Sequence, residues 1–349
     1  MSLMYELLKK NQDLWDLFTR KEEYFPEKLD KHQRFLFSEK YLQNASEPEV
    51  SRYLIENGMQ VEFPENQTFA VCLTHDVDDI YPPLSHSLLS SAYSFKRLNF
   101  KDLANQLLWK LRGIDYSPYL NFSKIMDIEA SFEAKSSFYF ITAEVDPIRF
   151  RYDIEDIEHH LGEILDRGGE VGLHGGYYSY DSPEKIKKEK QRLEAVLGKK
   201  VIGFRNHYLR FKTPDSWEIL TDAGFNYDST FGYYDCAGFR NGMCHPFSPY
   251  NLDTGKEIDI LEIPLVVMDV ALFATSNSFE EAWEHTKNLI DTTASFNGVI
   301  TLLWHNFVFG CSFRNDWVKL YEKVLQYCFD KGAWMTSGEE IFRWWADRN

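Results

Sequence analysis

The feature that most constrains this chain is a short acidic segment, Thr74-His75-Asp76-Val77-Asp78, at the end of an apolar run. Apolar residues alternate with other residues from Phe69 to Leu73, which is typical of a strand. Side chains in a strand alternate between faces, so Asp76 and Asp78 are expected to point the same way. Two carboxylates on one face can share a metal ion or divide acid–base work. The alternative is an acidic turn, where aspartate is common.

Strand and helix patterns alternate from Gln67 onward. Two helices are bounded by Ser-Pro or Thr-Pro at the start and by glycine at the end, at residues 182–198 and 213–224. We expect strands at residues 69–74, 137–141, 170–173, 201–204, 225–227, 258–263 and 299–304, with a short one near Trp334. Such alternation predicts a parallel sheet with helices outside, and about seven units favour an α/β barrel over an open sheet.

Two other segments flank or interrupt this pattern. Residues 1–66 predict helices and loops without a chemical motif, so we expect a helical extension packed on a main domain at residues 67–349. Residues 80–122 are rich in serine and leucine and predict a partly helical insertion. Together with the aromatic-rich stretch at residues 231–250, this insertion is expected to shape a substrate cleft.

Charge and cysteine usage narrow the classes of function. The net charge of −16 predicts repulsion from nucleic acid and from an anionic membrane surface. Aromatic residues make up 16%, which fits either a sugar-facing surface or a large aromatic core. The five cysteines have no metal-binding or redox spacing, and no apolar leader or span of about 18 residues is present. We therefore expect reduced thiols, a cytoplasmic location and no membrane span.

Titratable residues follow five of the expected strands. Taken singly, each has an ordinary structural explanation as a hydrogen-bonded histidine, a surface ion pair or a turn. Jointly they predict a site at the C-terminal ends of the strands, and carboxylate with imidazole suits a borderline divalent cation. The residues are Asp76, Asp78, His174, Arg205, His207, Asp228 and His305.

The order of these motifs resembles the polysaccharide deacetylases of carbohydrate esterase family four, which carry the NodB-type homology domain. The motifs are Asp-x-Asp, Gly-x-His-Gly, Arg-x-x-Tyr, Asp-Ser-Thr and Leu-Leu-x-His, and they cover roughly residues 67–310. The resemblance implies a distorted (β/α)7 barrel that removes N-acetyl groups from amino sugars with a divalent metal ion.

The resemblance also implies a metal site. The family's aspartate ligand falls on Val77, and Asp78, one position on, is the expected replacement. His174 matches the first histidine ligand, whereas Tyr178 stands where the second is expected. His207 stands where the family's Arg-x-Pro-Tyr motif has proline, and we infer that it supplies the missing imidazole.

One divalent ion, with zinc favoured, would then be bound by Asp78, His174 and His207. The alternative is that the metal is lost. We place His75 in the same pocket as His207, and two unusual histidines there favour relocation of the ligand over its loss. Removal of one ligand would leave the others as costly unpaired polar groups.

The catalytic roles follow from the same resemblance. Asp76 matches the catalytic base and Arg205 the residue that orients it. Tyr208 matches the residue whose backbone N–H helps to hold the oxyanion. His305 matches the general acid, and Asp228 is expected to tune it.

These roles predict a metal-dependent hydrolase acting on an N-acetylated amino sugar or glycan precursor. One alternative is a hydrolase of another non-peptide C–N bond, in a cyclic or linear amide, with or without metal. Another is a non-catalytic carbohydrate-binding protein. The joint presence of Asp76, Arg205 and His305 argues against the last, because binding alone does not need all three.

Overall fold

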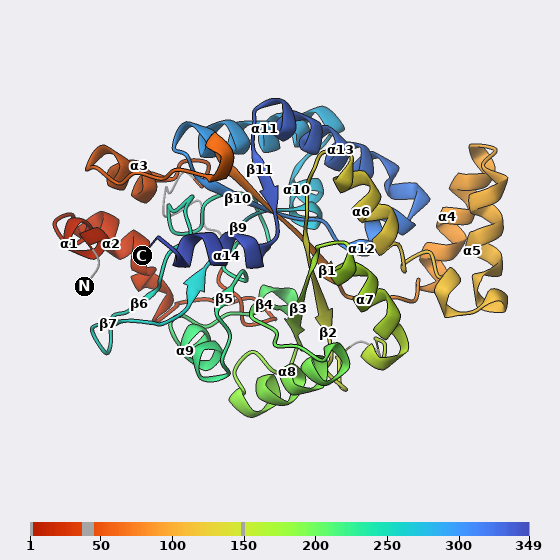
Figure 1. Ribbon diagram of the computed structural model, residues 1–349, viewed down its shortest axis with the longest axis horizontal. Coiled ribbons are helices and arrows are strands. Elements are labelled where there is room, and N and C mark those ends of the chain that lie inside the picture. Colours follow the sequence, from red (N-terminus) through yellow and green to blue (C-terminus); the bar gives the residue numbers. More distant parts are fainter. Residues whose placement is uncertain (1–2, 37–44, 148–150, 349) are drawn as a thin grey trace.

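The computed structural model describes residues 3–36, 45–147 and 151–348, and its centre is a curled parallel sheet (Figure 1). The strand order is β8-β5-β4-β3-β2-β1-β10-β9. The additional strand β11 pairs with residues 70–72 of β1, just before the part of β1 that pairs with β2. The strands are β1 (Ala70–Val77), β2 (Ser137–Ile141), β3 (Glu170–Gly175), β4 (Gly203–Asn206), β5 (Tyr227–Asp228), β8 (Leu261–Glu262), β9 (Leu265–Met268), β10 (Val299–Leu303) and β11 (Trp334–Thr336). Within the described chain the order ends at β8 and β9, so the barrel is distorted, as expected from the sequence.

The predicted single strand at residues 258–263 is wrong in extent. The structure has two short strands there, β8 and β9, at opposite ends of the sheet order. Pro264 lies between them and has no N–H to donate to a ladder, which favours a break at this point. The consequence is an additional strand end, after Met268.

Helices cover the outside of the sheet (Figure 1). Their starts follow the serine signals in the sequence: the Ser182 hydroxyl accepts the Lys185 N–H at the start of α8, and Ser278 and Ser337 cap α11 and α14 in the same way. Gly198 ends α8 with a φ of 66°, a conformation that glycine adopts without strain. The covering helices are α6 (Phe122–Ala130), α7 (Glu158–Asp166), α8 (Pro183–Leu197), α9 (Asp215–Asp222), α11 (Phe279–Ser295) and α13 (Asn315–Asp330). Helix α14 (Gly338–Ala346) instead lies across the middle of the sheet, where Ile341 packs in one cluster with Ala70 and Cys72 of β1 (Figure 1).

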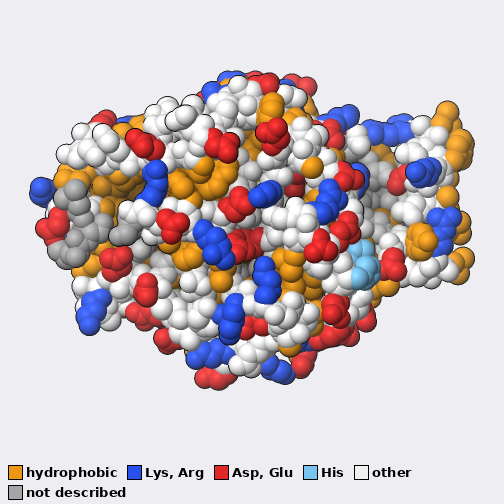
Figure 2. All heavy atoms as spheres, viewed as in Figure 1, with side chains coloured by type: hydrophobic (Ala, Val, Ile, Leu, Met, Phe, Trp, Pro, Cys, Tyr) orange, Lys and Arg blue, Asp and Glu red, His pale blue; other side chains and the backbone are white. Residues whose placement is uncertain are grey.

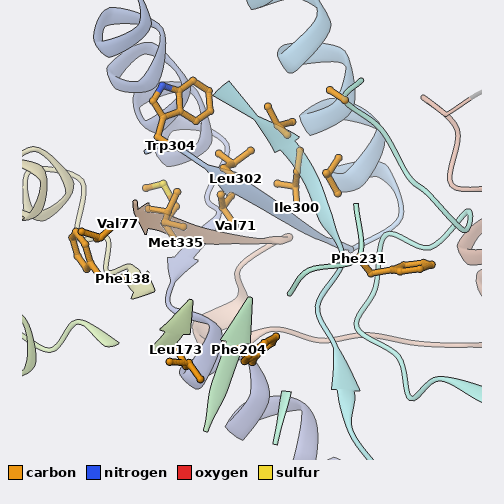
Figure 3. Packing of buried hydrophobic residues seen from close by; sticks show 14 of the residues in the cluster. Val71, Val77, Phe138, Leu173, Phe204, Phe231, Ile300, Leu302, Trp304 and Met335 are labelled. Atoms are coloured by element: carbon orange, nitrogen blue, oxygen red, sulfur yellow. The ribbon is translucent and has the colours of Figure 1, made fainter. Parts of the chain in front are cut away.

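Strand β1 shows how the core is divided. Val71 and Val77 belong to the large cluster that packs under the helices, together with Ile300 of β10 (Figure 3). Ala70 and Cys72 belong to a smaller cluster on the other face of the sheet. Side chains alternate along β1, and Asp76 comes four residues after Cys72 and two after Thr74. Asp76 therefore points to the same face as Cys72, which is the barrel interior.

The N-terminal extension contains α1 (Leu3–Leu8), α2 (Gln12–Thr19) and α3 (Glu49–Glu56). It packs on the barrel beside the hairpin of β6 (Tyr250–Asn251) and β7 (Lys256–Glu257), and the Tyr5 hydroxyl donates to the Ser248 carbonyl at 3.0 Å. The strongest polar link is the buried Glu23. Its carboxylate accepts from Arg20 at 2.8 Å and from Arg240 of the barrel at 2.6 Å.

Glu23→Ala is expected to lower the free energy of unfolding by about 3–5 kcal/mol, because removal of Glu23 leaves the buried guanidinium of Arg240 without its carboxylate. The pKa of Glu23 supports this: burial raises it, but Arg240 and Arg20 outweigh burial and lower it. Urea denaturation of the full chain measures the change. Glu27→Ala, at an exposed position of the same extension, is the control and should change stability by less than about 0.5 kcal/mol. Equal effects of the two substitutions would contradict the role of Glu23.

The insertion between β1 and β2 forms two paired helices, α4 (Leu84–Lys96) and α5 (Phe100–Arg112). They lie at one end of the molecule's longest axis, opposite the end that carries both termini (Figure 1). No helix in the described part of the chain is both long and apolar enough to cross a membrane.

Candidate active site

A cleft of about 490 Å³ opens at the C-terminal ends of the strands. Parallel strands bring their C-terminal ends to one face, so residues far apart in sequence meet there. The cleft is lined by Asp76 from β1, Asp78 directly after it, His174 from β3, and His207 and His305, which follow β4 and β10. Five of the residues predicted from the sequence therefore lie together.

Asp78, His174 and His207 form a compact group of possible metal ligands. Oδ1 of Asp78 lies 3.3 Å from Nε2 of His174 and 3.4 Å from Nε2 of His207. Nδ1 of His174 donates to the Arg205 carbonyl at 3.0 Å, which leaves Nε2 facing Asp78. All the candidate ligand atoms lie within 4.8 Å of one another.

The pKa shifts of Asp78 and His207 suit a cation. Burial raises the pKa of Asp78, but the imidazoles of His207, His174 and His305 outweigh it and hold the pKa well below its ordinary value. Burial lowers the pKa of His207 to about 4, although Asp78 opposes that shift. Carboxylate anion and neutral imidazole are the forms that bind divalent metals. Oδ1 of Asp78 is also buried without a hydrogen-bond partner among the described residues, so the group fits a bound divalent ion.

Asp76 is fixed by the fully buried Arg205. Nη1 of Arg205 donates to Oδ1 of Asp76 at 3.1 Å and to the Thr74 hydroxyl at 2.7 Å. The other side of the guanidinium donates to the carbonyl and the hydroxyl of Ser229, both at 2.8 Å. Four of the five N–H groups of Arg205 are thus engaged, and the Asp76 carboxylate is held beside the metal-ligand group, with Oδ2 3.6 Å from Nε2 of His174.

His305 is held by a carboxylate that the sequence analysis missed. Oδ1 of Asp269 lies 2.7 Å from Nδ1 of His305, and Oδ2 accepts the backbone N–H of the same residue at 2.8 Å. Burial lowers the pKa of His305, but Asp269 outweighs burial and raises it to about 9. The imidazole is therefore protonated at neutral pH, with Nε2 facing the cleft 3.9 Å from Oδ2 of Asp78.

From the sequence, Asp228 is expected to tune His305. In the described residues the carboxylate that contacts His305 is Asp269, and Asp228 contacts Thr230 instead. The Asp228 carboxylate accepts the hydroxyl of Thr230 at 2.6 Å and the backbone N–H of the same residue at 3.1 Å. Burial raises the pKa of Asp228 to about 6, and the neighbouring Glu262 shares its buried environment. Asp269 directly follows β9, so the strand-end pattern would have found it if residues 258–268 had been divided into two strands.

Tyr178 and His75 are the two other unusual positions of the motifs, and neither lines the cleft. Tyr178 is 43% exposed and does not line the cleft, so it does not stand in for the missing histidine. His75 is fully buried on the opposite face of β1, where Nδ1 contacts the Trp304 carbonyl at 2.7 Å and Nε2 contacts Glu129 at 2.8 Å. The expectation that His75 shares a pocket with His207 is wrong, because adjacent residues of a strand face opposite ways.

Tyr208 lines the cleft directly after His207. Its φ of 62° is uncommon for a residue with a side chain, and its carbonyl accepts from Arg34 of the extension at 3.0 Å. Sequence reasoning also missed Asp146, whose Oδ2 lies 3.6 Å from Nδ1 of His207. Asp146 follows β2 by five residues, so only the strand-end pattern could have indicated it.

Comparisons with known proteins identify the fold. No protein-family model matches this sequence, and no curated protein matches it. Among solved structures, a protein assigned as a polysaccharide deacetylase from Mycobacterium smegmatis is 19% identical, with a TM-score of 0.54 over 82% of this chain and 93% of that one. Puue allantoinase is 15% identical, with a TM-score of 0.55 over 83% of this chain and 95% of that one. The chain therefore has the fold that the sequence resemblance implied.

Proposed function

We propose that this chain is a divalent-metal-dependent hydrolase that removes the N-acetyl group from an amino sugar or a glycan precursor. The proposal depends on one observation above all. A single cleft holds an unpaired carboxylate oxygen between two imidazoles, an arginine-held carboxylate and a carboxylate-held imidazole. Metal-assisted amide hydrolysis uses this combination of a cation site, a base and an acid.

The metal would be held by Asp78, His174 and His207, and zinc suits a set of one carboxylate and two imidazoles. When bound, such an ion polarises a carbonyl group and makes nearby water more acidic. Asp146 lies 3.6 Å from Nδ1 of His207, beyond hydrogen-bond range, so it acts on that imidazole through its charge.

The chain's own groups supply the proton transfers. Asp76, oriented by Arg205, takes a proton from the attacking water. His305, protonated at neutral pH, gives its Nε2 proton to the leaving amine as the C–N bond breaks. The backbone N–H of Tyr208 helps to hold the developing oxyanion. Asp269 is a positioning residue, because it acts through His305.

The cleft also suits a sugar. The rings of Tyr208, Tyr234 and Phe307 line it beside the polar groups, and such rings can stack on the apolar face of a pyranose. All five cysteines are free thiols, which supports the cytoplasm as the proposed location.

Hydrolysis of another C–N bond is the second candidate. The same base, acid and cation site would serve a cyclic or linear amide, and one protein of the same fold is named as an allantoinase. A panel of N-acetylated amino sugars and cyclic amides, assayed for released acetate and for ring opening, distinguishes the two. Binding of sugars without turnover across the panel would instead indicate a carbohydrate-binding protein.

Purified wild-type protein is expected to bind about one divalent ion per chain, and His207→Ala to weaken that binding at least ~100-fold, because one of three protein ligands is removed. Metal analysis after dialysis against graded zinc concentrations measures both. Tyr178→Ala is the matched control: it changes the position where the family resemblance expects the second histidine, and it should keep its metal. Retention of metal by His207→Ala, or loss by Tyr178→Ala, would contradict the relocated ligand.

A further inference from the structure

The insertion of α4 and α5 has an inverted distribution of polar and apolar side chains. The buried residues of α4 are all serines: Ser87, Ser90, Ser91 and Ser94. Its exposed face carries large apolar side chains, among them Leu88, which is 59% exposed, and Phe95, which is 63% exposed. A helix that packs in water normally buries its apolar face.

Helix α5 repeats the inversion. Its outer face carries Phe100, Leu107 and Leu111, the last of which is 85% exposed. These three lie within one narrow arc at about 100° per residue. Its buried residues are Gln106, whose amide donates to the Gly310 carbonyl at 2.9 Å, and Trp109, so the inversion in α5 is less complete than in α4. Of the sixteen large hydrophobic side chains that are exposed in the described chain, eleven lie between Leu84 and Tyr116.

The contact side of α4 resembles helix packing in an apolar medium. Ser87 and Ser91, and likewise Ser90 and Ser94, are four residues apart, so each pair occupies one row of the helix. Small residues at this spacing allow close approach of helices without an apolar interface, which is the usual arrangement where the surroundings are themselves apolar. In water alone, this distribution leaves the leucines exposed with no compensating gain.

The charge of the insertion is opposite to that of the body. Residues 84–112 contain five basic residues and one acidic residue, a net charge of +4 in a chain of −16, so the remainder carries −20. The five are Lys96, Arg97, Lys101, Lys110 and Arg112, all exposed, and none forms an ion pair within the described chain. Figure 2 shows apolar side chains gathered at the end of the molecule formed by α4 and α5, with basic ones beside them.

We propose that the outer face of the α4–α5 hairpin docks on an anionic phospholipid surface. An apolar helix face flanked by lysine and arginine is suited to the boundary between lipid headgroups and acyl chains. The proposal concerns binding alone and stands independently of the proposed reaction.

The geometry favours lying in the interface over crossing it. Each helix has 13 residues and is about 20 Å long, shorter than the ~30 Å hydrocarbon core. The overall charge predicts repulsion from anionic lipid, but most of the acidic body lies behind the hairpin along the longest axis (Figure 1). Charges more than about 8 Å away are largely screened at physiological salt, so a membrane that meets the hairpin is affected mainly by the positive charge of the hairpin.

The hairpin also lies next to the candidate active site. Pro83 and His86, at the base of α4, line the cleft, so docking would bring the cleft close to the surface.

Sedimentation with large vesicles tests the proposal on the full chain. Vesicles of phosphatidylcholine are compared with vesicles in which phosphatidylglycerol replaces about a third of the lipid, at low salt and at about 0.5 M salt. We expect tight binding only to the anionic vesicles, weakened by salt. The double substitution Lys101→Glu with Arg112→Glu should weaken binding at least ~30-fold, because each basic residue near such a surface contributes about fivefold. Leu107→Asn with Leu111→Asn should weaken it as well.

The matched control is Lys187→Glu with Lys199→Glu, two exposed lysines in and just after α8, which makes the same change in net charge elsewhere. This variant should bind like the wild type. No binding by the wild type, or an equal loss in all three variants, would overturn the proposal. Sedimentation equilibrium without lipid provides a second readout: a dimer that the leucine substitutions dissociate, with no vesicle binding, would assign the face to a second copy of the chain and also overturn it. Unfolding midpoints establish that each variant is folded.

Discussion

Asp76→Asn is expected to lower kcat about 1,000-fold or more while the divalent ion stays bound. The substitution keeps the shape of the side chain and an oxygen that can accept from Arg205, but it removes the group that takes the proton from water. General base catalysis typically contributes between 10² and 10⁴ in rate, and Asp76 is the cleft carboxylate that Arg205 holds beside the metal-ligand group.

Two measurements are needed for this variant, kcat for amide hydrolysis and metal content per chain. Asp79→Asn is the matched control, since Asp79 also lines the cleft but its carboxylate pairs with Arg151 at 3.1 Å. It should reduce kcat less than tenfold. If Asp76→Asn keeps most of its activity, Asp76 is not the base; if it loses its metal, Asp76 is a ligand instead.

The sequence was sufficient to predict the centre of this site because strand geometry is regular. A period of two places Asp76 on one face of β1, and parallel strands with helical crossovers bring His174, His207 and His305 to the same end. The same period of two puts His75 on the opposite face of β1, as the structure shows. The period was not applied to His75 in the sequence analysis, and His75 was therefore put in the wrong pocket.

The rest depended on information that local patterns do not carry. The division of residues 258–268 into β8 and β9 is set by pairing with β5 and β10, which are distant in sequence, so the end of β9 and Asp269 were missed. The inference that His207 supplies the missing imidazole rested on the family resemblance, because no local pattern shows that β3 and β4 are neighbours. The serine face of α4 could not be recognised as buried from its pattern, because periodicity alone assigns the apolar face to the interior.

Asp269→Asn is expected to lower kcat about 100-fold at pH 8 and to move the alkaline limb of the pH profile to lower pH. In the wild type, Asp269 outweighs burial and raises the pKa of His305 to about 9, so the general acid carries its proton up to that pH. A neutral amide at position 269 leaves burial as the dominant influence, and burial lowers the pKa of an imidazole. The charges of Asp78 and Asp76 would still oppose burial, so the pKa of His305 would fall from about 9 toward its ordinary range, and the fraction able to protonate the leaving amine at pH 8 would fall with it.

The measurement is kcat between pH 5 and about 10, with the unfolding midpoint recorded at each pH. Asp228→Asn is the informative control, because Asp228 is the carboxylate that the sequence pattern assigned to His305 and that the structure places against Thr230. It should leave the position of the alkaline limb unchanged. A limb that moves in Asp228→Asn and stays in place in Asp269→Asn would return the tuning role to Asp228. A limb that moves in Asp269→Asn and stays in place in Asp228→Asn would confirm that Asp269, at the end of β9, sets the pKa of the general acid.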